Sequence, residues 1–78
     1  MSQHRNIPEV MLAAVPSLRA FAISLSGNVD RADDLVQETL VRAMVNLNSL
    51  EPGTKLSEWL FKILRDLFRS QFRKRRSH

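Results

Sequence analysis

Basic side chains recur at helical spacing near the C-terminal end of the chain. They are Lys62, Arg65, Arg69, Arg73 and Arg76. On an α-helix, which turns by about 100° per residue, these five fall within about 80° of one another and form one cationic ridge. Each can neutralise a phosphate, and contacts over roughly 21 Å of helix would give salt-dependent binding of a nucleic acid. An ordinary solvated face is the alternative, but such faces usually mix charges, and Asp66 is the only acid in residues 61–78.

A second candidate surface, the acidic face, lies on a helix predicted over about residues 30–47. It gathers Asp34, Gln37, Glu38, Val41 and Val45 on one side. Valines among carboxylates are costly to leave in water but suit a partner that offers apolar contacts and arginines. Scattered exposed valines are also common and need no partner. The acidic face alone is therefore a weaker signal than the cationic ridge.

Catalytic chemistry has little support in the sequence. Asp33, Asp34 and Glu38 share a helix, but no His and no Gly-rich phosphate loop accompanies them. One helix cannot wrap carboxylates round a divalent ion, and the chain has no Cys and only two His, both near its ends. We expect a binding protein rather than an enzyme, with no cofactor and no metal.

Helices must position both surfaces, and the chain predicts an all-α fold. Its 78 residues, 44% hydrophobic and 26% charged, suit one folded domain of modest size. Apolar residues at spacings of three and four predict helices over about 7–26, 30–47 and 56–76, hence a compact bundle of three main helices. Pro16 removes one helical hydrogen bond, so it either kinks the first helix or begins a second one, and we expect a break near Val15.

Helix ends and buried positions follow from the same pattern. Gly27 and Asn28 suit the end of the first helix, Asp30 is expected to cap the second, and Thr54 or Ser57 the third. The expected buried residues are Leu12, Val15, Leu18, Phe21, Ala22 and Leu25, then Leu35, Val36, Leu40, Ala43, Met44 and Leu47, then Leu56, Trp59, Leu60, Ile63, Leu64 and Leu67. Phe68 is also assigned to the core, whereas Phe61 and Phe72 can either complete the core or stack on unpaired bases.

Residues 48–55 predict a loop, because Pro52 and Gly53 together break helices. Asn48, Ser49 and Thr54 can hydrogen-bond the edge of a base, and the backbone at Gly53 can approach a ligand closely. A plain turn between helices explains the same residues, and without further information it is the simpler interpretation.

Charge is distributed unevenly. The net charge is +4, but residues 61–78 hold seven lysines and arginines and one acid, so the first sixty residues are net negative. A basic end and an acidic body predict a polyanion on one side and a different partner on the other. No apolar run approaches the roughly 18 residues of a membrane span, and the N-terminus lacks a basic-then-apolar leader, so we expect a soluble cytoplasmic protein.

From about Leu12 to Arg76 the chain resembles region 2 of the extracytoplasmic-function sigma factors, the small sigma subunits of bacterial RNA polymerase. The segments that carry the resemblance are DRADDLVQETLVRAMVNL, from Asp30, and EPGTKLSEWLFKILRDLFRSQFRKRR, from Glu51. The segments LRAFAISLSGN, DDLVQETLVRA and WLFKILRDLFRS are particularly similar to the EcfG-type general stress-response sigma factors of alphaproteobacteria.

The resemblance implies a monomeric transcription initiation domain with two binding surfaces. The acidic face would dock on the clamp helices of the polymerase β′ subunit. The loop from about Asn48 to Lys55 would capture a base flipped from the non-template strand of the minus-ten promoter element, which offsets a few kcal/mol of unstacking and so couples recognition to melting. The implied DNA contacts are Asn48, Ser49, Thr54, Lys55, Lys62, Arg65, Asp66, Arg69, Arg73 and Arg76.

Anti-sigma factors usually cover the polymerase-binding surface of this family. For EcfG-type relatives the anti-sigma factor is a NepR-type protein, which a PhyR-type response regulator removes with its own sigma-like domain. Such a decoy, which binds the anti-sigma factor and not DNA, is the alternative interpretation. The decoy has no need for aligned basic residues, and its receiver domain does not fit in 78 residues. A generic basic single-strand binder would explain the ridge but not the DLVQE segment.

Three departures from the family pattern stand out. Asp66, seven residues after Trp59, replaces a common Asn, and its carboxylate can only accept hydrogen bonds and would repel phosphate. Met44 replaces a frequent Trp. The chain is also too short to contain the family's second domain, region 4, so we expect a domain excerpt rather than a natural truncation or one part of a split system.

Overall fold

Three α-helices and one short 3-10 turn make up the computed structural model. It describes residues 7–51 and 53–76, with side chains for 9–51 and 53–71. The elements are α1 (Ile7–Ser26), α2 (Val29–Val45), η1 (Leu47–Ser49) and α3 (Leu56–Arg76). The described residues contain no strand, and the prediction of an all-α bundle of three main helices is confirmed.

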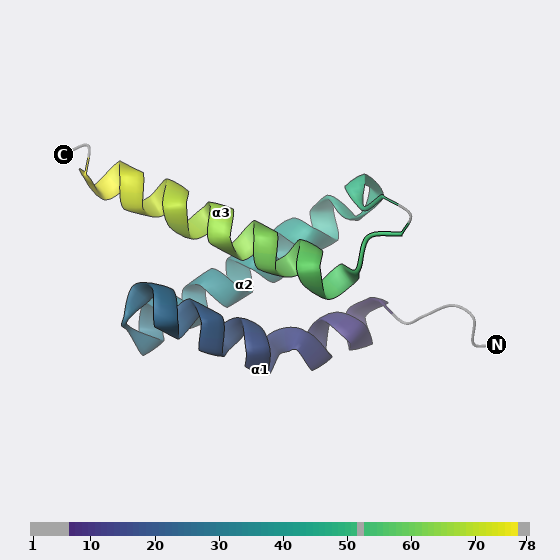
Figure 1. Ribbon diagram of the computed structural model, residues 1–78, viewed down its shortest axis with the longest axis horizontal. Coiled ribbons are helices and arrows are strands. Elements are labelled where there is room, and N and C mark those ends of the chain that lie inside the picture. The colour runs from purple at the N-terminus through teal and green to yellow at the C-terminus, as the bar shows by residue number, and fades with distance from the viewer. Residues whose placement is uncertain (1–6, 52, 77–78) are drawn as a thin grey trace.

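Each helix packs against the other two. Figure 1 shows α2 crossing behind α1 and α3, with α1 below and α3 above it in that view. The expected range of the second helix is shifted, because α2 begins one residue earlier and ends two residues earlier than predicted, and η1 takes up Leu47.

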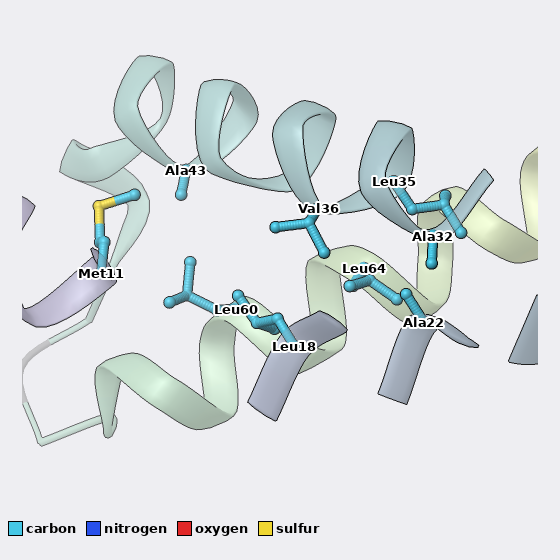
Figure 2. Close-up of a cluster of buried hydrophobic side chains, with 9 residues drawn as sticks. All are labelled: Met11, Leu18, Ala22, Ala32, Leu35, Val36, Ala43, Leu60 and Leu64. Carbon is cyan, nitrogen blue, oxygen red and sulfur yellow. The ribbon is translucent and has the colours of Figure 1, made fainter. Parts of the chain in front are cut away.

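The core lies between the three helices. Its buried apolar residues are Met11, Leu18 and Ala22 from α1, Ala32, Leu35, Val36 and Ala43 from α2, and Leu60 and Leu64 from α3 (Figure 2). Phe68 and Trp59 pack partly buried against this cluster, as predicted. Phe61 also joins the core, where its ring meets Phe21 edge to face with centroids 5.3 Å apart. The side chain of Phe72 lies outside the described residues.

Two residues expected in the core face solvent instead. Leu12 is 65% exposed and Met44 is 54% exposed. Met11, the neighbour before Leu12, is buried although it was not expected in the core, whereas Ala43, the neighbour before Met44, is buried as predicted. Leu18 and Ala22 of α1 and Leu35, Val36 and Ala43 of α2 are buried as predicted, so both helices present the expected side to the core and the two exposed residues lie at the edges of the predicted stripes.

The predicted break near Val15 is wrong. α1 is one helix with Pro16 inside it. Pro16 and Leu12 are both exposed, so the Leu12 carbonyl that loses its usual amide partner lies on the solvent side, where water can satisfy it. Buried Met11 and Leu18 hold the segments on either side of Pro16 against the same core. The ribbon of α1 curves around its middle, as expected for a helix with an internal proline (Figure 1).

The link between α1 and α2 is capped by Asn28, and the expectation that Asp30 is the cap is wrong. Gly27 has φ 69 and its amide donates to the Ile23 carbonyl at 2.7 Å, which closes α1. The Asn28 side chain accepts a hydrogen bond from the Arg31 amide at 2.9 Å. Asp30 lies one position inside α2, where its negative charge suits the helix dipole.

We predict that Gly27→Ala lowers the free energy of unfolding by about 1 kcal/mol. No atom lies within 4 Å of a Cβ at Gly27, so the cost comes from the left-handed backbone alone. Gly27→Asn should cost less, since asparagine tolerates this conformation. Urea denaturation of the three proteins measures the difference. Equal losses for the two variants would contradict the backbone explanation.

Helix α1 also corrects the expectation about apolar runs. Among the residues that the structure describes, Glu9–Ser26 is long and apolar enough to cross a membrane by length and composition. One such helix is weak evidence for a membrane span, because core helices of soluble proteins and signal sequences pass the same test, and α1 packs against the other helices through Met11, Leu18 and Ala22. The stretch was missed because Glu9 and Arg19 interrupt its apolar residues.

Candidate functional site

The cationic ridge is exposed where its side chains are described. Lys62, Arg65 and Arg69 lie on the side of α3 away from buried Leu60 and Leu64. Arg73 and Arg76 continue the same helix, but their side chains lie outside the described residues. The structure thus brings three of the five predicted phosphate contacts to one solvent-facing surface.

Asp66 interrupts the ridge and makes two long ion pairs within it. Its Oδ2 lies 3.7 Å from Lys62 Nζ, and its Oδ1 lies 3.9 Å from Arg65 Nε. All three side chains are more than half exposed, so water screens these pairs and their contribution to stability is small. Their effect is mainly on the surface potential, because Asp66 offsets part of the positive charge that would attract phosphate.

A cleft of about 390 Å³ opens between the C-terminal part of α2, η1 and α3. We call it the α2–α3 cleft. Its lining residues are Arg42, Asn46, Ser49, Trp59, Ile63, Asp66, Leu67 and Ser70. Trp59, Ile63 and Leu67 recur every four residues and form one apolar wall on α3, while α2 and η1 supply polar groups. An aromatic wall facing polar groups in a cleft of this size suits a planar, hydrogen-bonding ligand such as a nucleobase.

Asn46 shapes the α2 side of this cleft. Its backbone amide and its side-chain amide both donate to the Arg42 carbonyl, at 3.0 and 2.9 Å. With these two hydrogen bonds to one carbonyl, α2 ends at Val45 and the chain turns into η1. There the Ser49 amide donates to the Asn46 carbonyl at 2.8 Å. Ser49 is thereby held at the rim of the cleft by backbone hydrogen bonds.

The remaining loop residues lie elsewhere. Asn48, Thr54 and Lys55 are exposed but do not line the cleft, so of the predicted base-binding side chains in the loop only Ser49 does. Thr54 closes a turn by donating its amide to the Glu51 carbonyl at 3.1 Å, with Gly53 at φ 91 inside the turn. The Lys55 carbonyl accepts from the Trp59 amide at 3.1 Å and α3 starts at Leu56, so Lys55 holds the cap position expected for Thr54 or Ser57.

Six cleft residues were not among the predicted contacts. Trp59, Ile63 and Leu67 were assigned to the core, and Arg42, Asn46 and Ser70 were not singled out. The available signal was the spacing of Trp59, Ile63, Asp66, Leu67 and Ser70, which places an aromatic residue, an acid and a hydroxyl along one side of α3. No pattern along the sequence shows that Arg42 and Asn46 face this side.

All five residues of the acidic face are exposed to solvent. Asp34, Gln37 and Glu38 are exposed, Val41 is 59% exposed and Val45 is 76% exposed. They lie opposite the buried side of α2, which carries Ala32, Leu35, Val36, Thr39 and Ala43. Glu38 Oε2 pairs with Arg42 Nε at 3.2 Å across one helical turn. Exposed valines beside unburied carboxylates are what a docking surface for a basic and partly apolar partner requires.

An apolar groove adjoins the acidic face. Met11 and Leu12 of α1 and Leu40 and Met44 of α2 line about 210 Å³ of open volume with no polar surface. Met44 lies one helical turn from both Leu40 and Val41, so the groove adjoins the exposed valines on α2. The exposed Leu12 and Met44, which departed from the predicted core, belong to this groove.

Comparison with known proteins agrees with this geometry. The family model Sigma-70 region 2 matches residues 11–78. The chain belongs to the sigma-70 region 2 family. Proteins of this family are initiation factors without enzymatic activity, so the prediction that the chain is not an enzyme is confirmed.

Relatives of this region 2 domain are extracytoplasmic-function sigma factors. The chain is 74% identical over 66 residues to the ECF RNA polymerase sigma factor EcfG of Rhodopseudomonas palustris strain TIE-1, a match that covers 85% of the chain and 36% of EcfG. It is 40% identical over 50 residues to SigW of Bacillus subtilis strain 168, covering 64% of the chain and 27% of SigW. The resemblance to the EcfG-type group is confirmed.

A solved structure shares the fold. The sigma factor RpoE of Bartonella quintana, crystallised in complex with the anti-sigma factor NepR, is 51% identical and superposes with a TM-score of 0.83. The match covers 90% of this chain and 44% of the RpoE chain. The region 2 domain thus spans about a third of EcfG and less than half of RpoE.

Proposed function

We propose that residues 1–78 form a single region 2 domain of an EcfG-type sigma factor that binds core RNA polymerase and melts the minus-ten element of stress-response promoters in the cytoplasm. The single observation that carries the DNA part is the α2–α3 cleft beside the cationic ridge. The ridge attracts the phosphates of an open strand, and Trp59 supplies a surface on which an extruded base stacks.

The cleft explains how such a domain favours the open promoter. A base that leaves the duplex loses its stacking and pairing, which costs a few kcal/mol, and a cleft that binds it offsets this cost. Recognition and strand separation then become one event, which needs neither a nucleotide nor a metal ion. Asn48, Thr54 and Lys55 lie outside the cleft and are proposed to contact the flanking strand.

The acidic face is the proposed polymerase contact, through the β′ clamp helices. Its exposure and its mixture of valines and carboxylates support this role. A NepR-type anti-sigma factor is proposed to compete for the acidic face and the neighbouring apolar groove, since a 51% identical sigma factor has been crystallised with NepR.

A sigma-like decoy that binds only the anti-sigma factor is the second candidate. The exposed Lys62, Arg65 and Arg69 count against it, because a decoy gains nothing from a cationic surface. The 74% identity to a sigma factor also favours the proposal over the decoy.

Arg69→Gln is expected to weaken binding of single-stranded minus-ten DNA and to lower its salt dependence. The loss of one phosphate contact should reduce the slope of log affinity against log salt by about 0.7. Fluorescence anisotropy at several salt concentrations measures this, with a scrambled strand of equal composition as the test of sequence preference.

Arg19→Gln is the matched control, because Arg19 is also exposed but lies on α1, paired with Asp33 at 2.7 Å. It changes the net charge equally and should leave the slope unchanged. Equal effects of both variants would show that only net charge matters, and equal binding of the scrambled strand would favour a generic single-strand binder.

A further inference from the structure

Asp66 is the acid inside the α2–α3 cleft, and its chemistry restricts what the cleft can hold. We propose that Asp66 makes the cleft select a nucleobase with an exocyclic amino group, such as cytosine, over thymine or uracil. This inference rests on the proposed function of the cleft and names the kind of base that it accepts.

The Asp66 carboxylate has free capacity to accept hydrogen bonds. Its two cationic neighbours, Lys62 Nζ and Arg65 Nε, lie 3.7 and 3.9 Å away, beyond the 2.7–3.2 Å usual for an N–H···O bond. An ionised carboxylate has about four acceptor positions and no donor. Asp66 therefore lines the cleft as an acceptor that a ligand amino group can satisfy.

The other polar groups of the cleft complete the pattern. The Asn46 side-chain NH₂ donates to the Arg42 carbonyl at 2.9 Å, which leaves its amide oxygen as a second acceptor. Donors come from the guanidinium group of Arg42, whose Nε already pairs with Glu38, and from the hydroxyls of Ser49 and Ser70. The cleft thus offers acceptors and donors over an apolar wall.

Cytosine matches this arrangement and uracil does not. Cytosine presents an N4 amino donor next to its N3 and O2 acceptors. Its amino group can donate a hydrogen bond to Asp66, while its acceptors can receive one from Arg42, Ser49 or Ser70. Uracil and thymine place the O4 carbonyl where the amino group would be. This carbonyl cannot donate to the Asp66 carboxylate, so the hydrogen bond is lost and two acceptors face each other. Trp59, Ile63 and Leu67 contact the face of either base and do not discriminate.

The test compares two strands that differ only in this group. An oligo-dT strand carries one central cytosine or one central uracil. Binding is followed by the anisotropy of a dye on the strand, and contact with the cleft by the emission of Trp59, the single tryptophan of the chain, which lines the cleft. The cytosine strand should bind about tenfold more tightly, in the range of one matched base contact. Asp66→Asn should reduce the ratio to about twofold or less, since an amide can either donate or accept.

A control variant separates the effect of the lost charge on affinity from the effect of the lost hydrogen bond. Asp66→Asn removes one negative charge from the ridge and should raise the affinity for both strands by the same factor. The ratio of the two affinities reports the base contact. Asp30→Asn makes the same chemical change in the first turn of α2, away from the cleft, and should keep the tenfold ratio.

The outcomes separate base selection by Asp66 from the proposed DNA-binding function. Binding of both strands without a preference, or a preference that survives in Asp66→Asn, overturns the role of Asp66 and leaves the proposed function standing. Binding that leaves the Trp59 emission unchanged places the DNA outside the cleft and also overturns the inference. Failure of both strands to bind even at low salt overturns the proposed DNA function, and the inference with it.

Discussion

Leu64→Ala is expected to lower the free energy of unfolding by about 2–5 kcal/mol. Leu64 is fully buried and belongs to the core cluster to which all three helices contribute (Figure 2). Truncation removes buried methyl groups and leaves a cavity that the surrounding helices cannot fill completely. A domain of this size has little stability in reserve, so the loss is a large part of the total. Urea denaturation followed by circular dichroism at 222 nm, a wavelength standard for helices, measures it.

Leu12→Ala provides the matched control for this experiment. The chemical change is identical, but Leu12 is 65% exposed on the outer side of α1. We expect a loss below about 1 kcal/mol, the usual range for surface substitutions plus the groove contact that is removed. If Leu12→Ala cost as much as Leu64→Ala, the orientation of α1 in the bundle would be wrong.

The helices themselves were predictable because local chemistry determines where they begin and end. The apolar spacing in residues 56–76 and the Pro52–Gly53 pair located α3, and Gly27 located the end of α1. The cap of α2 was misplaced because Asn28 and Asp30 are both good capping residues two positions apart. Only the hydrogen bond from the Arg31 amide to the Asn28 side chain distinguishes them.

The edges of the buried stripes were less predictable, since they depend on packing between segments. Met11 was missed, and Leu12 and Met44 were wrongly assigned to the core, because the pattern along one helix cannot say which apolar residues at the edge of a stripe a second helix covers. Thr39 was missed for another reason, as it is polar yet fully buried. Its hydroxyl donates to the Leu35 carbonyl at 2.7 Å, so burial leaves no unsatisfied donor.

The candidate site was predicted only where one helix carries it. The ridge and the acidic face each lie on a single helix, so helical geometry alone gave their members. The α2–α3 cleft joins Arg42 and Asn46 to Trp59 and Ser70, and such a junction depends on how two helices cross. Asp66 was singled out as unusual, but its place inside a cleft emerged only from the fold.

Glu38→Lys is expected to weaken association with a β′ clamp-helix fragment by about thirtyfold or more. Glu38 is exposed at the centre of the acidic face, between Asp34 one turn before it and Val41 one turn after it. Reversing its charge removes an attraction and adds a repulsion against a basic partner, a change of about 2 kcal/mol or more for a close charge pair. Binding by isothermal titration calorimetry at low and moderate salt measures the effect.

The fold should survive this change, which makes a binding loss interpretable. Glu38 and Arg42 form an exposed pair that contributes less than about 1 kcal/mol, and two basic residues one turn apart cost a few tenths more. Glu58→Lys is the matched control, because Glu58 is exposed in the first turn of α3 and the change in net charge is the same. If both variants bound equally well, or lost affinity equally, the acidic face would not be the polymerase contact. A loss confined to Glu38→Lys would instead identify α2 as the docking helix, because only the position of the added charge differs between the two proteins.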